Sequence, residues 1–201
     1  MTGRLRSGLI ALALLLWPAA SQAAVDIHFY SHDFGRAFPH AFVVLKGTID
    51  ATQEPVDTNI GFSATSVSPA MLVKPFEGAV EIGIISADYI SRSKKQFSLV
   101  LSDDEYRAVM NVVEAWRAKA QPSYSLNTSN CVHFIADIAL ALKLNAEPRR
   151  GLMRNPRGFL ERVKADSLAV LAARTNPPPA AIGVAGGQAR DPAGRLEALA
   201  E

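Results

Sequence analysis

The chain has 201 residues, of which 49% are hydrophobic and 20% charged, which is enough for one domain with a substantial core. Its formal net charge of +2 includes Arg4 and Arg6; without them the 21 basic residues fall to 19, equal to the 19 acidic ones. A balanced chain with no basic run and no basic helix face lacks the signature of nucleic-acid binding.

The first 23 residues have the pattern of a secretory signal peptide. Two arginines precede an apolar run over residues 9–17, and Ser21-Gln22-Ala23 fits a small-x-small cleavage site. The run is too short and wrongly flanked for a stable membrane span, although an uncleaved N-terminal anchor remains the alternative. We therefore expect a periplasmic or secreted protein whose mature chain has no transmembrane span.

Five stretches of the next eighty residues have the alternating or β-branched patterns of strands. They are VDIHFY (25–30), HAFVVLKGTI (40–49), TNIGFSATSV (58–67), AVEIGIIS (79–86) and KQFSLVLS (95–102). A polar turn containing Pro55 joins the second stretch to the third, which predicts a hairpin. A short irregular or helical segment is expected to begin at Ser68-Pro69.

Helices are predicted in the second half of the chain. Ser102 and Glu105 form a capping box, which predicts a helix over about 103–119 with apolar residues at helical spacing on its buried face. The stretch CVHFIADIALALKL (131–144) is apolar nearly all round, which indicates a central buried helix. Asn155-Pro156 predicts an N-cap followed by a helix to about residue 164, with a further helix to about residue 174.

Strands followed by helices predict an α+β fold, in which a small antiparallel sheet packs against helices. We expect one domain over residues 24–174. The segment over residues 175–201 is rich in Pro, Gly and Ala and has little to bury, so we expect a flexible tail.

Cys131 is the one cysteine of the chain, so no second thiol can pair with it inside the chain. Its predicted position is the first turn of a helix, where unpaired backbone N–H groups and the helix dipole favour a thiolate and lower the thiol pKa. The same N–H groups could stabilise an oxyanion. The alternatives are an inert core cysteine and a disulfide between two chains.

A thiol nucleophile needs a base, and histidine is the usual one near neutral pH. His133 lies two positions after Cys131 on the same helix, so we expect it to point elsewhere and to be packed and hydrogen-bonded. His28 and His32 lie in or just after the first strand, where either could be on the surface. His40 opens an apolar strand, from which it could reach a helix N-terminus packed across the sheet.

The stretch YSLNTSNCVHF (124–134) resembles the cysteine motif of the lecithin:retinol acyltransferase-like family. Tyr124, Asn130 and Cys131 are in step with that motif, as are the two residues after Val132, which stands where the family prefers glutamate. HAFVVLKG (40–47) resembles the family's histidine strand. These proteins resemble circularly permuted papain-like hydrolases of the NlpC type, in which histidine precedes cysteine. The resemblance covers about residues 40–144 and implies a permuted papain-like arrangement with His40 and Cys131 as the catalytic pair.

The resemblance also implies a third polar residue on the strand after the histidine, where it orients the imidazole. Asn59 is the preferred candidate, with Ser63 and Thr58 as alternatives, because the register of the hairpin cannot be read from the sequence. Tyr124 could line the site or donate a hydrogen bond to an oxyanion, or it could simply pack the loop. Val132 is expected to face away from the thiol.

These residues together predict a secreted cysteine hydrolase of the amidase or peptidase type, which acts through a thioester, with cell-wall peptides as the candidate substrates. A lipid acyl-ester hydrolase or acyltransferase is the alternative, as is a non-catalytic binding domain on the same scaffold. We expect a monomer that needs no cofactor and no metal, since no Cys/His cluster has zinc spacing and no glycine-rich phosphate loop is present.

Overall fold

A computed structural model of the chain describes residues 24–33, 38–119 and 123–175, and it has an α+β fold. Six antiparallel strands form one sheet in the order β5-β1-β2-β3-β4-β6. The strands are β1 (Val25–His32), β2 (His40–Thr48), β3 (Pro55–Ala64), β4 (Phe76–Ile82), β5 (Lys94–Leu101) and β6 (Ser123–Tyr124).

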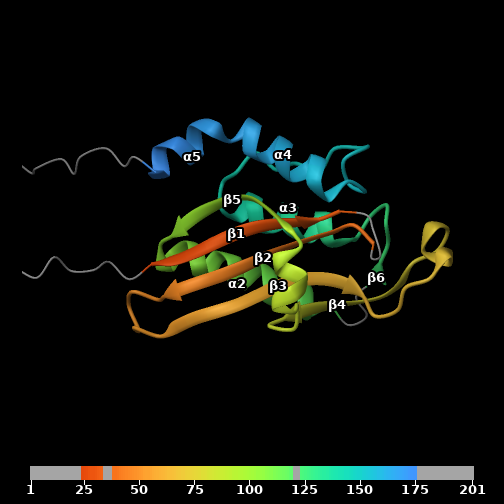
Figure 1. Cartoon of the computed structure of the whole chain (residues 1–201), viewed down its shortest axis with the longest axis horizontal. Helices are drawn as coiled ribbons and strands as arrows, with labels where there is room; N and C mark the ends of the chain where they lie inside the picture. Colours follow the sequence, from red (N-terminus) through yellow and green to blue (C-terminus); the bar gives the residue numbers. More distant parts are fainter. Residues whose placement is uncertain (1–23, 34–37, 120–122, 176–201) are drawn as a thin grey trace, which may run out of the picture.

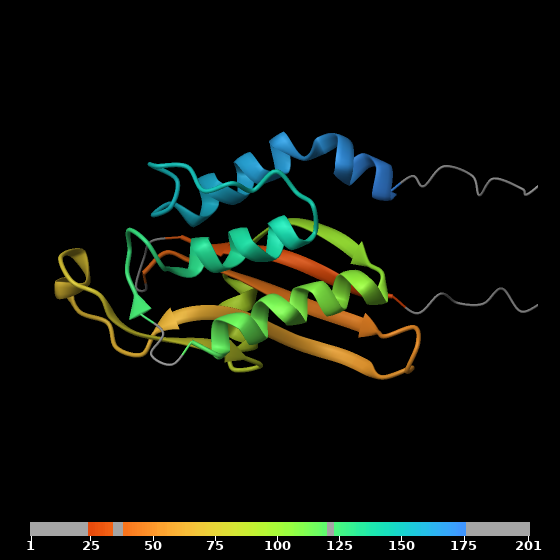
Figure 2. The same cartoon turned by 180° about the vertical axis from the view of Figure 1, so that it is seen from behind.

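Helices cover both faces of this sheet unequally (Figures 1 and 2). On one face lie the long helices α2 (Asp103–Arg117) and α3 (Cys131–Ala141), with α4 (Pro156–Asp166) and α5 (Leu168–Thr175) beside them towards β1 and β5. On the other face the short helix α1 (Ala87–Ser91) lies across β2 and β3. The 3-10 helix η1 (Pro69–Leu72) projects from one end of the sheet, the end where β2 begins.

The main core lies between the sheet and α2, α3 and α4. Alternate residues of the central strands point into it, including Ala41, Val43 and Leu45 of β2 and Phe62 of β3. Every residue of β2 from Ala41 to Leu45 is buried, because α1 covers the opposite face as well. The near-continuous apolar pattern of this strand therefore reports a strand covered on both sides.

Four of the five predicted strands are confirmed, and the hairpin between β2 and β3 is confirmed with them. The strand predicted over residues 79–86 is displaced, since β4 runs from Phe76 to Ile82. Gly83 ends it by adopting a φ of 72° and donating its N–H to the Asn59 carbonyl at 2.8 Å. The residues that follow form α1, a five-residue helix capped by Ser86 that the sequence analysis did not predict.

The predicted helices are all present. The capping box at Ser102 and Glu105 is formed, and α3 begins at Cys131 behind the N-cap Asn130. Asn155 caps α4, with Pro156 as its first residue. The expected signal peptide (1–23) and most of the expected tail (176–201) lie outside the described residues, and α5 extends to Thr175. Within the described ranges, no helix is long and apolar enough to cross a membrane.

Candidate functional site

The N-terminus of α3 is held in place by one buried amide, that of Asn130. Its Oδ1 accepts the backbone N–H of Val132 at 2.8 Å and of His133 at 3.3 Å. Its Nδ2 donates to the carbonyls of Leu126 at 2.8 Å and Met153 at 2.7 Å. The side chain therefore caps the helix and ties it to the loops before and after it, which fixes the position of Cys131.

The Cys131 thiol lies where three elements meet. It is 3% exposed, in the first turn of α3. The hydroxyl of Tyr124, from β6, donates to Sγ at 3.8 Å, and the backbone N–H of Ala41, near the start of β2, also points at the sulfur. The sulfur therefore faces hydrogen-bond donors from a helix terminus, a strand start and a phenol.

Burial raises the pKa of the Cys131 thiol, and it outweighs the donors around the sulfur. The Ala41 N–H, the Tyr124 hydroxyl and the N–H groups of the first helical turn all act in the opposite direction. This result differs from the expectation that the helix terminus alone would lower the thiol pKa. The resting cysteine is a protonated, occluded thiol with donors already aimed at it.

His40 precedes Ala41 and is buried at the start of β2. Burial, together with the nearby His32, lowers the pKa of His40 to about 4, so its imidazole is neutral at pH 7. The ring packs on Phe42 at 5.8 Å between centroids. Its Nε2 lies over Gly61 and has no hydrogen-bond partner within the described ranges. Among the described residues no hydrogen bond joins this ring to Cys131, although the adjacent Ala41 N–H reaches the sulfur.

Asn59 holds a loop in place, and among the described residues its amide has no hydrogen bond to His40. The β2–β3 register pairs Asn59 with Val44, four residues along β2 from His40. Its Oδ1 accepts the Ile85 N–H at 2.9 Å, and its Nδ2 donates to the Ile85 carbonyl at 3.0 Å. The amide thus holds the loop between β4 and α1 through both backbone polar groups of one residue, Ile85.

Two of the polar residues that share a cavity with His40, Ser63 and Glu81, lie on the strands beside it. Continued by two residues, the β2–β3 register places Ser63 beside His40. Ser63 Oγ donates to Glu81 Oε2 at 3.0 Å, and the register of β3 and β4 pairs Glu81 with Gly61, beneath the imidazole. Sequence reasoning named Ser63 as an alternative but missed Glu81; the signal available was the acidic residue inside the apolar stretch AVEIGIIS.

Two cavities open at this end of the molecule. The larger, which we call the α1 cavity, has a volume of about 570 Å³ and is lined by residues that include His40, Ser63, Glu81 and Tyr89. The smaller, the thiol cavity, has a volume of about 190 Å³ and includes Cys131. Phe38, Pro39, Met71 and Tyr124 line both cavities, so the two are neighbours separated by shared side chains.

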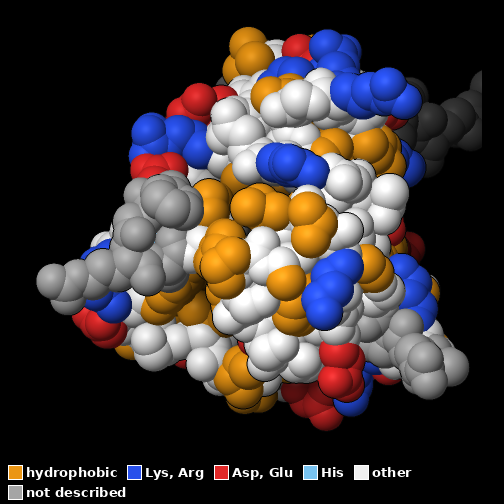
Figure 3. Space-filling view, turned by 90° about the vertical axis from the view of Figure 1, so that its right-hand side faces the viewer, with side chains coloured by type: hydrophobic (Ala, Val, Ile, Leu, Met, Phe, Trp, Pro, Cys, Tyr) orange, Lys and Arg blue, Asp and Glu red, His pale blue; other side chains and the backbone are white. Residues whose placement is uncertain are grey.

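The surface around the cavities is apolar with a basic surround. Viewed from the end where η1 projects, hydrophobic side chains gather across the middle of the face, with Lys and Arg side chains above and beside them (Figure 3). Leu72 is 60% exposed and Val73 is 87% exposed in this region. A ligand that enters from this end meets apolar side chains before it reaches the polar groups inside.

The other histidines have different partners. His133 Nδ1 accepts the Asn130 backbone N–H at 3.3 Å, as expected for a packed, hydrogen-bonded residue. His28 bonds to Ser98 at 2.7 Å, and His32 bonds to Ser93 at 3.0 Å and stacks on Tyr89. Val132, expected to face away from the thiol, lines the thiol cavity.

No metal-binding cluster is found in the described part of the chain, where no group of three or more His, Cys, Asp or Glu side chains could hold an ion. Comparison of the chain with protein-family models, curated proteins and solved structures found no match. The function of this protein is therefore inferred from the geometry around Cys131 and His40.

Proposed function

We propose that this protein is an exported cysteine hydrolase of amide or ester bonds, with Cys131 as nucleophile and His40 as general base. The observation that carries the proposal is the convergence of donors on Cys131 Sγ from α3, β2 and Tyr124. The β2 donor, Ala41, directly follows His40 in the chain, and His40 Nε2 is buried without a partner among the described residues. On this proposal the sheet and α3 form a permuted papain-like arrangement, with the histidine strand before the cysteine helix.

The directions of the two pKa shifts favour one form of the mechanism. The thiol pKa is raised and the imidazole pKa is lowered, so the resting pair is neutral rather than a thiolate–imidazolium ion pair. His40 would take the thiol proton as sulfur attacks the substrate carbonyl, and it would return that proton to the leaving amine or alcohol. Water would then hydrolyse the thioester, and this step would release the carboxylic acid and regenerate the Cys131 thiol.

Donors for the tetrahedral oxyanion are available beside the sulfur. The backbone N–H of Cys131 lies at the helix terminus, and the Tyr124 hydroxyl donates to the sulfur at 3.8 Å. Burial raises the pKa of Tyr124 well above its ordinary value, so this hydroxyl remains a proton donor throughout the working pH range. Ser63 and Glu81 replace Asn59 as the candidates for the polar group near His40.

The proposal is tested by acylation of the mature protein with p-nitrophenyl butyrate, with the butyryl adduct located by mass spectrometry. We expect a hydroxylamine-sensitive thioester on Cys131 and none in Cys131→Ser. His40→Ala should slow adduct formation by roughly 10²-fold or more, as expected for loss of a general base. A stable protein that forms no adduct on Cys131, or forms it equally fast in His40→Ala, contradicts the proposal.

Cell-wall peptides are the first substrates to test. Lipid acyl esters are the second, and the apolar walls of the α1 cavity favour them. A non-catalytic binding domain is the second candidate function, and the occluded state of Cys131, which is 3% exposed, favours it. In that case ligand binding would be unchanged in Cys131→Ala.

A further inference from the structure

The α1 cavity contains a carboxylate in an otherwise uncharged, largely apolar lining. Phe38, Ile85 and Tyr89 are among its apolar and aromatic walls, and Glu81 is the one charged side chain among the described residues that line it. Within the same described ranges no lysine or arginine forms an ion pair with Glu81. Its one described hydrogen-bond donor is the neutral Ser63 hydroxyl, at 3.0 Å.

A carboxylate at an apolar surface loses part of its hydration free energy, and pairing with a cation compensates best for that loss. Ser63 supplies one hydrogen bond to Oε2, which leaves the other acceptor positions of the carboxylate free for a ligand. Burial raises the pKa of Tyr89 to about 12 and also raises that of Tyr124, and the nearby Glu81 carboxylate adds a smaller contribution to both. Both phenols therefore stay neutral beside Glu81 and add no competing charge.

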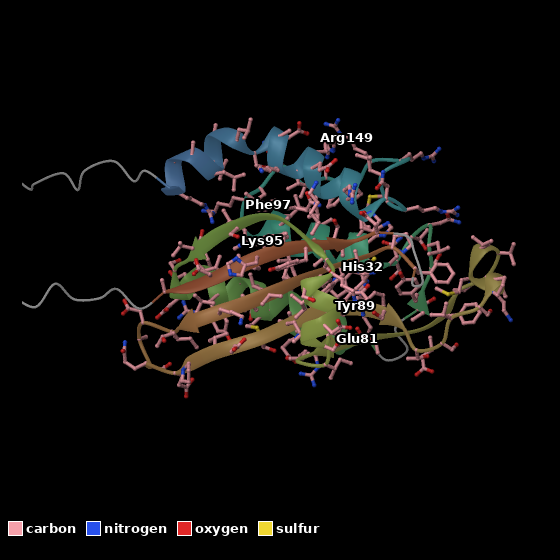
Figure 4. All side chains as sticks on the ribbon, in the orientation of Figure 1. His32, Glu81, Tyr89, Lys95, Phe97 and Arg149 are labelled. Atoms are coloured by element: carbon pink, nitrogen blue, oxygen red, sulfur yellow. The ribbon has the colours of Figure 1, made fainter. Side chains whose placement is uncertain are left out.

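The walls of the cavity are held in fixed positions. Asn59 clamps Ile85 through two hydrogen bonds, and the ring of Tyr89 stacks on His32 with 4.2 Å between centroids. Figure 4 shows His32, Tyr89 and Glu81 following one another across the sheet on the α1 side, near the end where the cavity opens. The position of the carboxylate relative to its apolar walls is thus set by the fold.

We propose that the α1 cavity binds a ligand with an apolar body and a protonated amine, and that the amine pairs with Glu81. As a binding statement this does not require Cys131 to be catalytic. As a statement about substrates it rests on the proposed function: the substrate would carry a free ammonium group on the side of the scissile bond that enters the α1 cavity. Neutral and anionic analogues of the same shape should bind less tightly, because no lysine or arginine among the described residues pairs with the Glu81 carboxylate.

The experiment measures binding of phenethylamine, phenethyl alcohol and 3-phenylpropionate to the Cys131→Ser protein by NMR titration. Using this variant separates the binding question from turnover. We expect phenethylamine to bind at least ~10-fold more tightly than the other two probes, with shifts at Ser63, Glu81 and Ile85, and Glu81→Gln to lose that preference. The glutamine variant keeps an acceptor for Ser63, so the fold should be retained.

Glu77→Gln is the matched control, since Glu77 lies on the same face of β4 but is exposed and does not line the cavity. It should leave the amine preference unchanged. Equal binding of the three probes, equal amine affinity in Glu81→Gln, or no binding of any probe overturns the inference. None of these results bears on acylation of Cys131, so failure of this inference and failure of the hydrolase proposal are distinguishable.

Discussion

The two ends of the proposed catalytic pair differ in how fully their polar atoms are satisfied. At the start of α3, the buried amide of Asn130 makes four hydrogen bonds to backbone groups. At the start of β2, His40 Nε2 is buried and has no hydrogen-bond partner among the residues that the structure describes. An unsatisfied buried polar atom costs free energy, so such an atom beside a cavity marks a place where the fold gives up stability. Asn130, which positions the thiol, therefore stabilises the fold, whereas the His40 imidazole has a nitrogen available to a bound ligand.

The largest expected effect is a loss of stability at the start of α3, where the polar atoms of Asn130 are all hydrogen-bonded. Asn130→Ala removes the N-cap of α3 and leaves the buried carbonyls of Leu126 and Met153 without donors. We expect a loss of roughly 4 kcal/mol in the free energy of unfolding, measured by urea denaturation. Asn155→Ala is the matched control: it also removes an N-cap asparagine, but this exposed side chain bonds only to the Gly158 N–H, so we expect about 1 kcal/mol. Similar losses in both variants would contradict this account.

The next effect concerns stability at acidic pH and comes from His40, at the start of β2. The pKa of His40 is lowered from 6.5 to about 4, so the unfolded chain binds more protons in this interval than the native protein. Stability is therefore full above about pH 6.5 and falls as the pH drops towards 4, by on the order of 3 kcal/mol from this group.

The measurement for this pH dependence is the free energy of unfolding between pH 4 and pH 7 in the native protein and in His40→Gln. The variant should have a visibly flatter profile. Burial also lowers the pKa of His28 and His133, so a residual slope of the same sign should remain. Parallel profiles for the two proteins would show that His40 is not buried in its neutral form.

A smaller effect is expected from the clamp on the roof of the α1 cavity. Asn59→Ala removes both hydrogen bonds to Ile85 and should cost about 2 kcal/mol in unfolding free energy. If Asn59 acts only through this loop, the pH dependence of Cys131 acylation should keep its shape while binding to the α1 cavity weakens. Asn127→Ala, at an exposed loop position, is the control and should change stability by less than ~0.5 kcal/mol.

The smallest stability effect, about 1 kcal/mol, is expected for Gly61→Ala. A Cβ at this position would lie 2.9 Å from His40 Nε2, so the imidazole must move. Acylation of Cys131 should slow although the protein remains folded. In the His40→Ala background the same methyl meets only Ile85 Cδ1, at 3.6 Å, so its cost should vanish. An additive double mutant would sink this explanation.

The sequence predicted those features of the fold that a few neighbouring residues determine, such as helix starts. The caps Ser102 and Asn155 located two helix starts, since a cap signal lies within four residues of chain. The end of β4 was misplaced because it depends on Gly83 adopting a positive φ, which the apolar pattern does not reveal. The five residues of α1 are too few to show helical periodicity.

The contacts of the candidate site were predictable from the sequence only between residues that are close together in the chain. Cys131 and Tyr124 belong to one short stretch, and the structure brings them within 3.8 Å. The neighbours of His40 depend on the register between β2, β3 and β4, which decides whether Asn59 or Ser63 lies beside it. Glu81 reaches the cavity through the pairing of β3 with β4, in which Gly61 and Glu81 are twenty positions apart in the chain, and no local pattern encodes that contact.

The clamp between Asn59 and Ile85 has a consequence for the rate at which ligands associate. An amide that bonds both the N–H and the carbonyl of one residue imitates a strand partner, so the loop before α1 is held in the manner of a paired strand. A cavity roofed in this way needs no ordering step when a ligand arrives, and little entropy is lost on binding. Association should then be limited by encounter and orientation, and selection among ligands should appear mainly in their residence times.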